Sequence, residues 1–140
     1  MVNGINHITF AVTNLEKSLD FYVNLVGLRL AARWDRGAYL LAGSQWIALN
    51  VDTERNSVPT KDYSHTSFNV LSSDFHTVKE KLEKAGVRPF QENTSEGESF
   101  YFLDPDGHKL ELHYNTIEDR LKWARENDWP SFTENKVRVM

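Results

Sequence analysis

Hydrophobic and polar residues alternate in several short runs along the 140-residue chain. Ile8, Phe10 and Val12 take every second position of the first run, and a period of two is typical of strands with one buried face. Runs with strand character also occupy residues 28–34, 38–42, 46–51, 63–70, 87–91, 100–103 and 109–114. The pattern therefore predicts short strands separated by turns over most of the chain.

Two longer segments instead carry apolar residues three or four positions apart, which indicates amphipathic helices. The first helix is predicted to begin after Asn14, a suitable N-cap, and to end at Gly27. The second is predicted to begin after Ser73 and to end at Gly86. Glycine favours the left-handed backbone conformation that commonly follows the last turn of a helix.

The predicted elements repeat in the same order. Residues 5–12 and 63–70 share His, Phe and Val in register, and a helix and three strands follow each octet. Thr116 opens a last helix with a sequence that resembles a capping box. We therefore predict a single α+β domain in which two βαβββ modules form a curved mixed sheet. Its parts are a first module at about residues 5–52, a linker at 53–62, a second module at about 63–115, and a C-terminal helix with its tail at 116–140.

Composition restricts the classes of function. Sixteen Lys and Arg against twenty Asp and Glu give a net charge of −4, which lacks the basic surplus that nucleic-acid binding requires. No apolar run is long enough to cross a membrane, and the N-terminus has no signal pattern, so we expect a cytoplasmic protein without nucleic-acid or membrane partners. The absence of Cys excludes disulfides and thiolate ligands, so any thiol must come from another molecule.

Strand alternation suggests a metal site. His7 falls on the polar face of the first strand, and His65 takes the equivalent position in its repeat. Glu111 falls on the polar face of the last strand, and a curved sheet would bring the three side chains together. Two imidazoles and one carboxylate can bind a divalent metal and leave positions open for a substrate oxygen. A lone strand histidine is usually structural, but its repetition favours the metal site. His113 shares the face of Glu111 and is either structural or in contact with a metal ligand.

Three other polar features have simpler interpretations. Asp104 and Asp106 lack the ligand spacing of a calcium loop, so a tight turn is predicted there. Residues 93–99 form a polar loop that is either a solvated turn or a source of oxygen ligands for a monovalent cation. Arg120, in the last helix, is by default a surface charge.

This arrangement resembles the vicinal-oxygen-chelate superfamily, which includes glyoxalases, bleomycin resistance proteins and dioxygenases. More narrowly, it is similar to the fosfomycin resistance glutathione transferases. The likeness rests on the paired modules with their two strand histidines, and it covers about residues 1–125. The segments that carry it are 31–40 (AARWDRGAYL), 62–65 (DYSH), 95–97 (SEG) and 99–113 (SFYFLDPDGHKLELH).

The resemblance implies a homodimer that binds Mn²⁺ through His7, His65 and Glu111, with the first-strand histidine coming from the partner chain. It also implies that fosfomycin binds through its phosphonate and epoxide oxygens, and that glutathione opens the epoxide. A loop-bound K⁺ would add positive charge beside the phosphonate.

The resemblance also implies roles for further residues. Thr9 would lie near the epoxide oxygen, Tyr39 near the thiol, and Trp46 in the wall of the substrate pocket. The residues that would hold the phosphonate are Ser95, Ser99, Tyr101 and Arg120. The residues that would form the potassium loop are Asn93, Ser95, Glu96, Gly97 and Ser99.

Other functions of this fold stay open. Known glutathione enzymes have other residues at the positions of Gln91, beside the cation loop, and of Arg36 and Asn50, near the thiol site. Another thiol is therefore an alternative. Hydrolysis by water needs a carboxylate base, and none is evident at residues 44–46. A metal-free drug-binding protein is a further alternative. Dioxygenases of this fold are typically longer, and glyoxalase-type isomerases commonly use a fourth protein ligand, which residues 48–50 do not supply.

Overall fold

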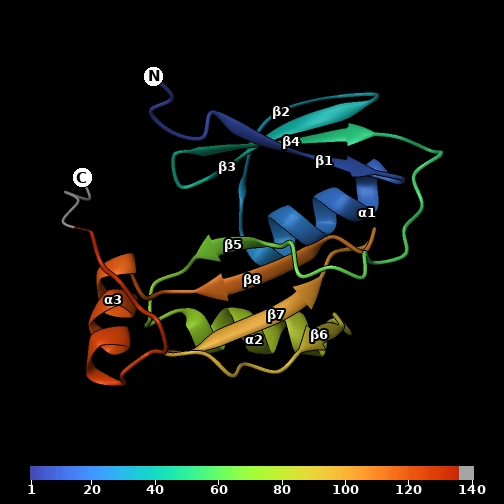
Figure 1. Ribbon diagram of the computed structural model, residues 1–140. Coiled ribbons are helices and arrows are strands. Elements are labelled where there is room, and N and C mark those ends of the chain that lie inside the picture. Colours follow the sequence, from blue (N-terminus) through green and yellow to red (C-terminus); the bar gives the residue numbers. More distant parts are fainter. Residues whose placement is uncertain (136–140) are drawn as a thin grey trace.

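Eight strands form two four-stranded sheets in the computed structural model, which describes residues 1–135 (Figure 1). The end of the predicted tail, residues 136–140, lies outside the described residues. The first sheet has the order β1-β4-β3-β2 and the second the order β5-β8-β7-β6. The first sheet consists of β1 (His7–Val12), β2 (Arg29–Trp34), β3 (Gly37–Ala42) and β4 (Gln45–Val51). The second consists of β5 (Thr66–Asn69), β6 (Pro89–Gln91), β7 (Ser99–Leu103) and β8 (Lys109–His113).

The two sheets repeat one topology, as the sequence pattern predicts. In each, the first strand runs parallel to the last, and the three later strands form an antiparallel meander. This confirms the α+β class and the paired βαβββ modules. The strand predicted at residues 63–70 is shorter than expected, because β5 begins only at Thr66. His65 therefore lies just before the strand rather than within it.

The helices largely follow the predicted caps. The side chain of Asn14 accepts a hydrogen bond from the Lys17 backbone and begins α1 (Leu15–Leu19). This helix continues directly as a π-helix, η1 (Asp20–Val26), which the apolar spacing did not reveal, and Gly27 ends it with a φ of 97°.

The other two helices are α2 (Phe75–Lys84) and α3 (Ile117–Glu126). The predicted N-cap at Ser73 is wrong by one residue, because Asp74 holds that position and makes no side-chain capping bond. The predicted capping box is present at Thr116 and Asp119, where each side chain bonds the backbone of the other residue. None of the helices among the described residues is both long and apolar enough to cross a membrane.

One hydrophobic core joins the two modules. Figure 1 shows α1 between the two sheets, and the ring centroids of Phe21 in η1 and Phe102 in β7 lie 6.1 Å apart. Phe10 and Val12 from β1 and Leu110 from β8 belong to the same buried cluster. Because strand residues alternate between faces, this shared core directs the polar face of each sheet away from the other module.

The turn between β7 and β8 fastens the second module to the first. Asp106 is 1% exposed and accepts hydrogen bonds from the Thr13 backbone at 3.1 Å, the Thr13 hydroxyl at 2.7 Å and the Ser57 hydroxyl at 2.9 Å. The Tyr22 hydroxyl donates to Asp104 at 2.7 Å. Burial, followed by the charge of Asp104, raises the pKa of Tyr22 well above its ordinary value, so the phenol stays a donor. The predicted turn is confirmed, and it also bridges the modules.

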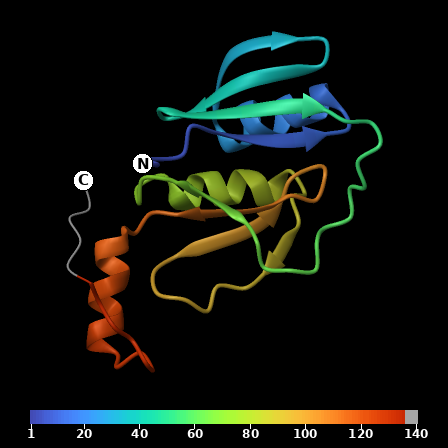
Figure 2. The same cartoon turned by 45° about the horizontal axis from the view of Figure 1, so that its top comes forward.

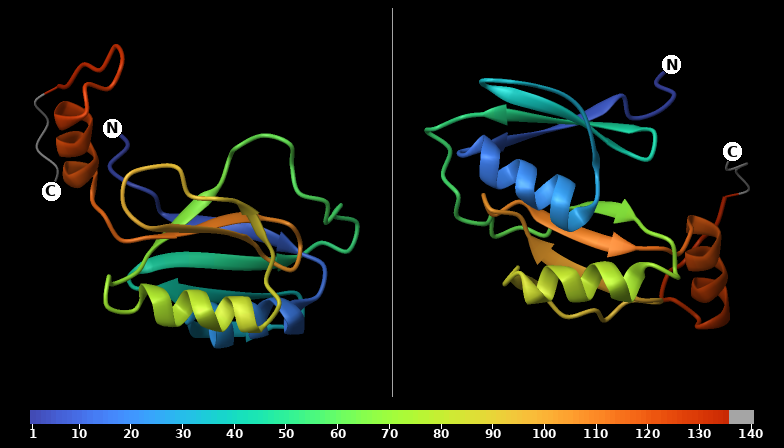
Figure 3. Two further views of the ribbon diagram at one scale, coloured as in Figure 1. Left: turned by 90° about the horizontal axis from the view of Figure 1, so that it is seen from below. Right: turned by 180° about the vertical axis from the view of Figure 1, so that it is seen from behind.

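Elements outside the core lie along the sides of the molecule. The linker between β4 and β5 runs down one side of both modules (Figure 2). Helix α3 stands at one end of the molecule, beyond the strands of the second sheet (Figure 3). The C-terminal helix can therefore contact the second module without taking part in the shared core.

We expect Asp106→Ala to destabilise the chain by roughly 3 kcal/mol, because it removes the buried carboxylate that accepts hydrogen bonds from Thr13 of the first module and Ser57 of the linker. Urea unfolding measures the free energy. Asp20→Ala is the matched control, since that exposed carboxylate accepts a single hydrogen bond, from the Asn24 side chain, within residues 1–135, and its loss should cost about 0.5 kcal/mol or less. Equal losses in the two variants would contradict the bridging role of the turn.

Candidate metal site

The second module brings two of the three predicted metal ligands together. His65 lies at the entry to β5, and Glu111 lies in the middle of β8, the parallel neighbour of β5. Nε2 of His65 is 3.1 Å from Oε1 of Glu111. The Glu111 residue is only 7% exposed, so its carboxylate is buried beside an imidazole.

The hydrogen bond on the other side of the ring determines what this pair can bind. Nδ1 of His65 lies 2.8 Å from the carbonyl oxygen of Tyr63. A carbonyl oxygen only accepts, so Nδ1 carries the hydrogen and, in the neutral ring, Nε2 presents a lone pair. That lone pair and the Glu111 oxygen face each other, which is favourable only with a proton or a cation between them. The donor set fits a divalent metal bound by imidazole and carboxylate.

His7 lies apart from this pair. Among residues 1–135, no three His, Asp or Glu side chains converge on a point that could hold a metal ion. The prediction that the curved sheet of one chain brings His7 to His65 and Glu111 is therefore wrong, because the shared core directs the two polar faces apart. His7 instead packs on Trp46, with ring centroids 4.3 Å apart. Its Nδ1 lies 2.7 Å from the side-chain oxygen of Asn6, an arrangement that leaves Nε2 as the ligand atom.

The residues around His7 form what we call the first half-site, a cavity of about 220 Å³ on the polar face of the first sheet. Thr9, Tyr39 and Trp46, all predicted to be functional, line it together with His7. Trp34 completes an aromatic row, with its centroid 4.7 Å from Tyr39, which in turn is 5.0 Å from Trp46. Sequence reasoning gave Trp34 no role, although it lies in a segment that carried the resemblance. The remaining lining residues are Ala48, Leu49 and Asn50.

One polar atom of the first half-site has no partner. Nε1 of Trp46 is buried and makes no hydrogen bond within the described part of the chain. A buried N–H without an acceptor is costly, so this atom is available to a bound polar group.

The second half-site surrounds His65 and Glu111 and includes two of the residues predicted to bind the phosphonate. Ser99 donates to Oε2 of Glu111 at 2.5 Å. Tyr101 is opposite Glu111 on β7 and is buried. Burial, then hydrogen bonding with Tyr63, raises the pKa of Tyr101, so its hydroxyl remains a neutral donor at pH 7.

The loop between β6 and β7 connects to α3 through an ion pair. Nε of Arg120 lies 2.6 Å from Oε2 of Glu96, and the Asn115 side chain donates to Oε1 of the same carboxylate. Burial alone would raise the pKa of Glu96, but the hydrogen bonds from Arg120 and Asn115 outweigh it and lower that pKa. Arg120 is therefore a fixed cation at the edge of the second half-site rather than an isolated surface charge.

The residues of the predicted potassium loop lie together. Asn93 donates to the Gly97 carbonyl oxygen at 2.7 Å and accepts from the Ser95 hydroxyl at 2.9 Å. Glu96 lies in the same loop, and Ser99 is the first residue of β7. Potassium binding by these oxygens stays a prediction.

Two of the three positions predicted to bear on the choice of thiol lie at the half-sites. Asn50 lines the first half-site. Arg36 donates to the Val51 carbonyl oxygen at 3.2 Å. Gln91 lies at the second half-site and donates to the Tyr63 hydroxyl at 3.1 Å.

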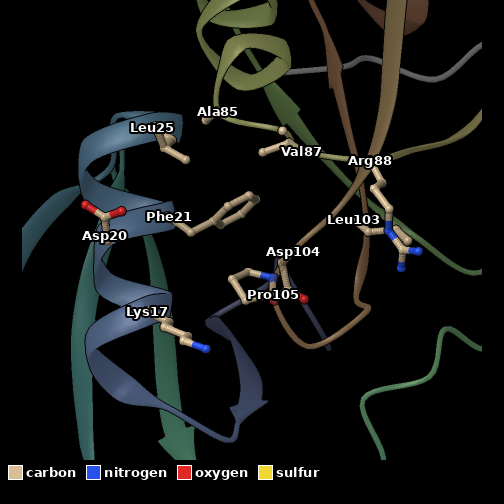
Figure 4. Close-up of a pocket in the computed structure, with 11 residues that line it drawn as sticks. Lys17, Asp20, Phe21, Leu25, Ala85, Val87, Arg88, Leu103, Asp104 and Pro105 are labelled. Atoms are coloured by element: carbon tan, nitrogen blue, oxygen red, sulfur yellow. The ribbon is translucent and has the colours of Figure 1, made fainter.

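A larger cavity lies elsewhere and contains none of the predicted site residues. It measures about 360 Å³ and separates η1 from the segment after α2 and from the β7–β8 turn. Figure 4 shows Phe21 pointing across it toward Val87. The cavity belongs to the junction between the modules, so concavity alone does not locate the chemistry of this chain.

The sequence of this chain is similar to those of known proteins. The family model described as "Glyoxalase/Bleomycin resistance protein/Dioxygenase superfamily" matches residues 4–112. "Glutathione transferase FosA" of Serratia marcescens is 48% identical over 131 residues, which cover 92% of this chain and 93% of that protein. "Metallothiol transferase FosB" of Staphylococcus haemolyticus is 35% identical over 90% of this chain and 94% of that protein.

Solved structures of fosfomycin resistance proteins share the fold. FosX from Listeria monocytogenes, as an E126Q mutant in complex with Mn(II) and 1S,2S-dihydroxypropylphosphonic acid, has a TM-score of 0.77 and 30% identity. That match covers 88% of this chain and 98% of FosX. FosX from Mesorhizobium loti has a TM-score of 0.74, also at 30% identity, over 86% of this chain and 99% of that one.

A side chain at Gly97 should destabilise the loop beside the second half-site. Its φ is +74°, and an added Cβ would lie 2.5 Å from Nδ2 of Asn115. Gly43 is the matched control, because its φ is +60° and an added Cβ would meet nothing within 4 Å. We expect Gly43→Ala to cost about 1 kcal/mol of unfolding free energy and Gly97→Ala roughly 2–3 kcal/mol. Urea unfolding of both variants checks this, and equal costs would show that the loop is not held against Asn115.

Proposed function

The chain belongs to the glyoxalase/bleomycin resistance protein/dioxygenase superfamily, and we propose that it is a metal-dependent transferase that adds the thiol of glutathione to the epoxide of fosfomycin. The observation that carries the proposal is the 48% identity, over 92% of the chain, with a protein named glutathione transferase FosA. The absence of Cys from the chain agrees with a free thiol as the source of sulfur.

The proposed metal is Mn²⁺, bound by His65 and Glu111 of one chain and the partner's His7. The two histidines resemble each other in one respect that supports this role. Each has Nδ1 within hydrogen-bond distance of an oxygen from a residue one or two positions earlier in the chain, so Nε2 is the atom available to a metal. When bound, the ion would supply Lewis-acid stabilisation of the charge that develops on the epoxide oxygen.

The proposed assembly is a homodimer in which each site combines the first half-site of one chain with the second half-site of the other. Each half-site lacks donors that the other has, and the shared core keeps the two apart within one chain. Trp34 is 42% exposed, Tyr39 39% and Tyr63 55%, so large aromatic surfaces at both half-sites are open to a second copy.

The negative charges at the proposed site require cations. A phosphonate carries up to two negative charges, and Glu111 adds one at the same site. The charge of Arg120 is balanced by Glu96 at 2.6 Å, so these three side chains together leave a net negative charge. A divalent cation at Glu111 and a K⁺ on the loop of residues 93–99 would reverse that sign.

The chain's own residues would then bind and orient the substrate. Tyr101 presents a hydroxyl beside Glu111, where it can donate to a phosphonate oxygen, with Ser95 and Arg120 at the loop edge. The hydroxyl hydrogen of Ser99 is donated to Glu111, so Ser99 would border the phosphonate without donating to it. Glu96 accepts from Nε of Arg120, so a phosphonate would be bound by the Nη groups, which can form a fork with an anion.

The first half-site would hold the epoxide end of fosfomycin and the incoming thiol. Attack by the thiolate forms a C–S bond and breaks a C–O bond, which leaves negative charge on the former epoxide oxygen. The Thr9 hydroxyl, on the same face as His7, can donate to that oxygen. Tyr39 would lie beside the incoming thiol, and Trp46 would form the wall of the pocket.

Hydrolysis by water is the competing reaction on this fold, and the residues present favour it less. Water requires a carboxylate base near the epoxide. Among the described residues that line the first half-site, none is acidic. Glu96 is held by Arg120 and Asn115, and Glu111 by Ser99 and His65. Another thiol in place of glutathione stays an alternative, because Gln91, Arg36 and Asn50 bear on thiol choice.

The proposed reaction is tested by ³¹P NMR of fosfomycin incubated with metal-stripped protein. We expect a new resonance only when Mn²⁺ and glutathione are added together. Product with metal and no thiol would identify a hydrolase, and product only with cysteine would identify a different thiol. Unchanged fosfomycin under all conditions would remove the proposal, and calorimetric fosfomycin binding that does not depend on Mn²⁺ would favour a drug-binding protein.

The shared site is tested by mixing two inactive variants, His7→Ala and Glu111→Ala. In a mixed dimer, the intact His7 of one chain meets the intact His65 and Glu111 of the other. Random 1:1 exchange should therefore restore roughly a quarter of wild-type activity, because half the dimers are mixed and each has one complete site. A mixture that stays inactive after demonstrated subunit exchange would show that sites are not built across chains. Co-purified dimers carrying two different tags provide the exchange control.

A further inference from the structure

His113 contacts both the loop between β6 and β7 and a proposed metal ligand. It lies on β8 two residues after Glu111 and directly opposite Ser99 on β7. Its Nδ1 is 2.9 Å from the Glu98 carbonyl oxygen and 2.8 Å from the Ser99 hydroxyl oxygen. The side chain is only 15% exposed, so these contacts are largely shielded from water.

The direction of each hydrogen bond follows from what the partners can do. The Glu98 carbonyl oxygen only accepts, so Nδ1 of His113 carries the hydrogen. Ser99 can therefore only accept from His113, sharing that hydrogen with the Glu98 carbonyl oxygen, and its own hydroxyl hydrogen is donated to Oε2 of Glu111 at 2.5 Å. A chain of donors thus runs from His113 through Ser99 to Glu111, and hydrogen bonds that point the same way strengthen one another.

We propose that His113 is a positioning residue that, through Ser99, presents Glu111 to the metal by a single oxygen. Oε2 is occupied by the Ser99 hydroxyl, while Oε1 faces Nε2 of His65 at 3.1 Å. The same imidazole fixes the backbone at Glu98, so the position of the metal ligand depends on the loop of residues 93–99. The inference rests on the proposed metal site and adds His113 to the residues that hold it in place.

The surroundings of His113 support a fixed position. An added Cβ at Gly97 would lie 3.3 Å from its Cε1, so the loop backbone packs closely on the ring. Groups that orient metal ligands in this way typically contribute 10–100-fold to metal affinity.

The test measures Mn²⁺ affinity of the full-length protein without substrate, from the free-ion signal in electron paramagnetic resonance titrations. His113→Phe keeps a ring but removes the donor, and we expect about 10–100-fold weaker binding. His113→Asn places an amide donor near the position of Nδ1, and we expect it to stay within about threefold of wild type. The matched control is His76→Phe, which removes an exposed imidazole 3.0 Å from the Glu98 side chain and should leave affinity unchanged.

A double-mutant cycle tests whether His113 acts through Ser99. If it does, Ser99→Ala combined with His113→Phe should bind Mn²⁺ no more weakly than Ser99→Ala alone. Independent effects, in which the two losses multiply, would overturn the proposal, as would wild-type affinity in His113→Phe.

Urea midpoints of the metal-free variants separate this role from general destabilisation. Should His113→Phe not fold, His113→Asn is paired with His113→Leu, and equal affinity in those two overturns the proposal. Wild-type protein that binds no Mn²⁺ would instead refute the proposed metal site itself.

Discussion

The structure depends most on the single hydrophobic core that both modules share. Because Phe10 and Leu110 must face that core, strand alternation directs His7 and Glu111 to the outer faces of their sheets. The apolar faces are shielded from water only while the two modules stay packed on the helices between them. Turning a polar face inward would expose this core, so the core keeps the polar faces directed outward. A complete three-ligand site is therefore incompatible with one chain folded in this way.

Within each module, by contrast, the metal donors are oriented by local contacts. The acceptor for His7 is Asn6, and the acceptor for His65 is the Tyr63 backbone, so each imidazole is aimed by a residue at most two positions away. Such contacts form with the strand itself and do not require a partner. The side chains of each half-site are consequently already oriented in the single chain. Association of two chains would need only to bring the half-sites together, without changing their conformations.

The sequence predicted the elements well because their signals are local. Alternation located the strands, and the capping residues at Asn14 and Thr116 located helix starts. The contact between His65 and Glu111 also follows from the sequence, since repeated modules place β5 beside β8. The separation of His7 could not be predicted, because it depends on how two finished modules pack. The pairing of Glu96 with Arg120 could not be predicted either, because no periodic pattern connects a loop to a distant helix.

The charge distribution indicates that, in the proposed reaction, the metal would bind before the substrate. An acidic chain whose buried Glu111 would face a phosphonate substrate opposes that substrate electrostatically, and Arg120 is already paired with Glu96. Binding of a divalent metal to the His65 and Glu111 pair would change the sign of the local potential before any phosphonate arrives. In the proposed reaction, the affinity for the substrate would thereby depend on the metal. Because His113 also bonds the Glu98 carbonyl oxygen, a change in the loop of residues 93–99 would reach Glu111 through three hydrogen bonds, by way of His113 and Ser99.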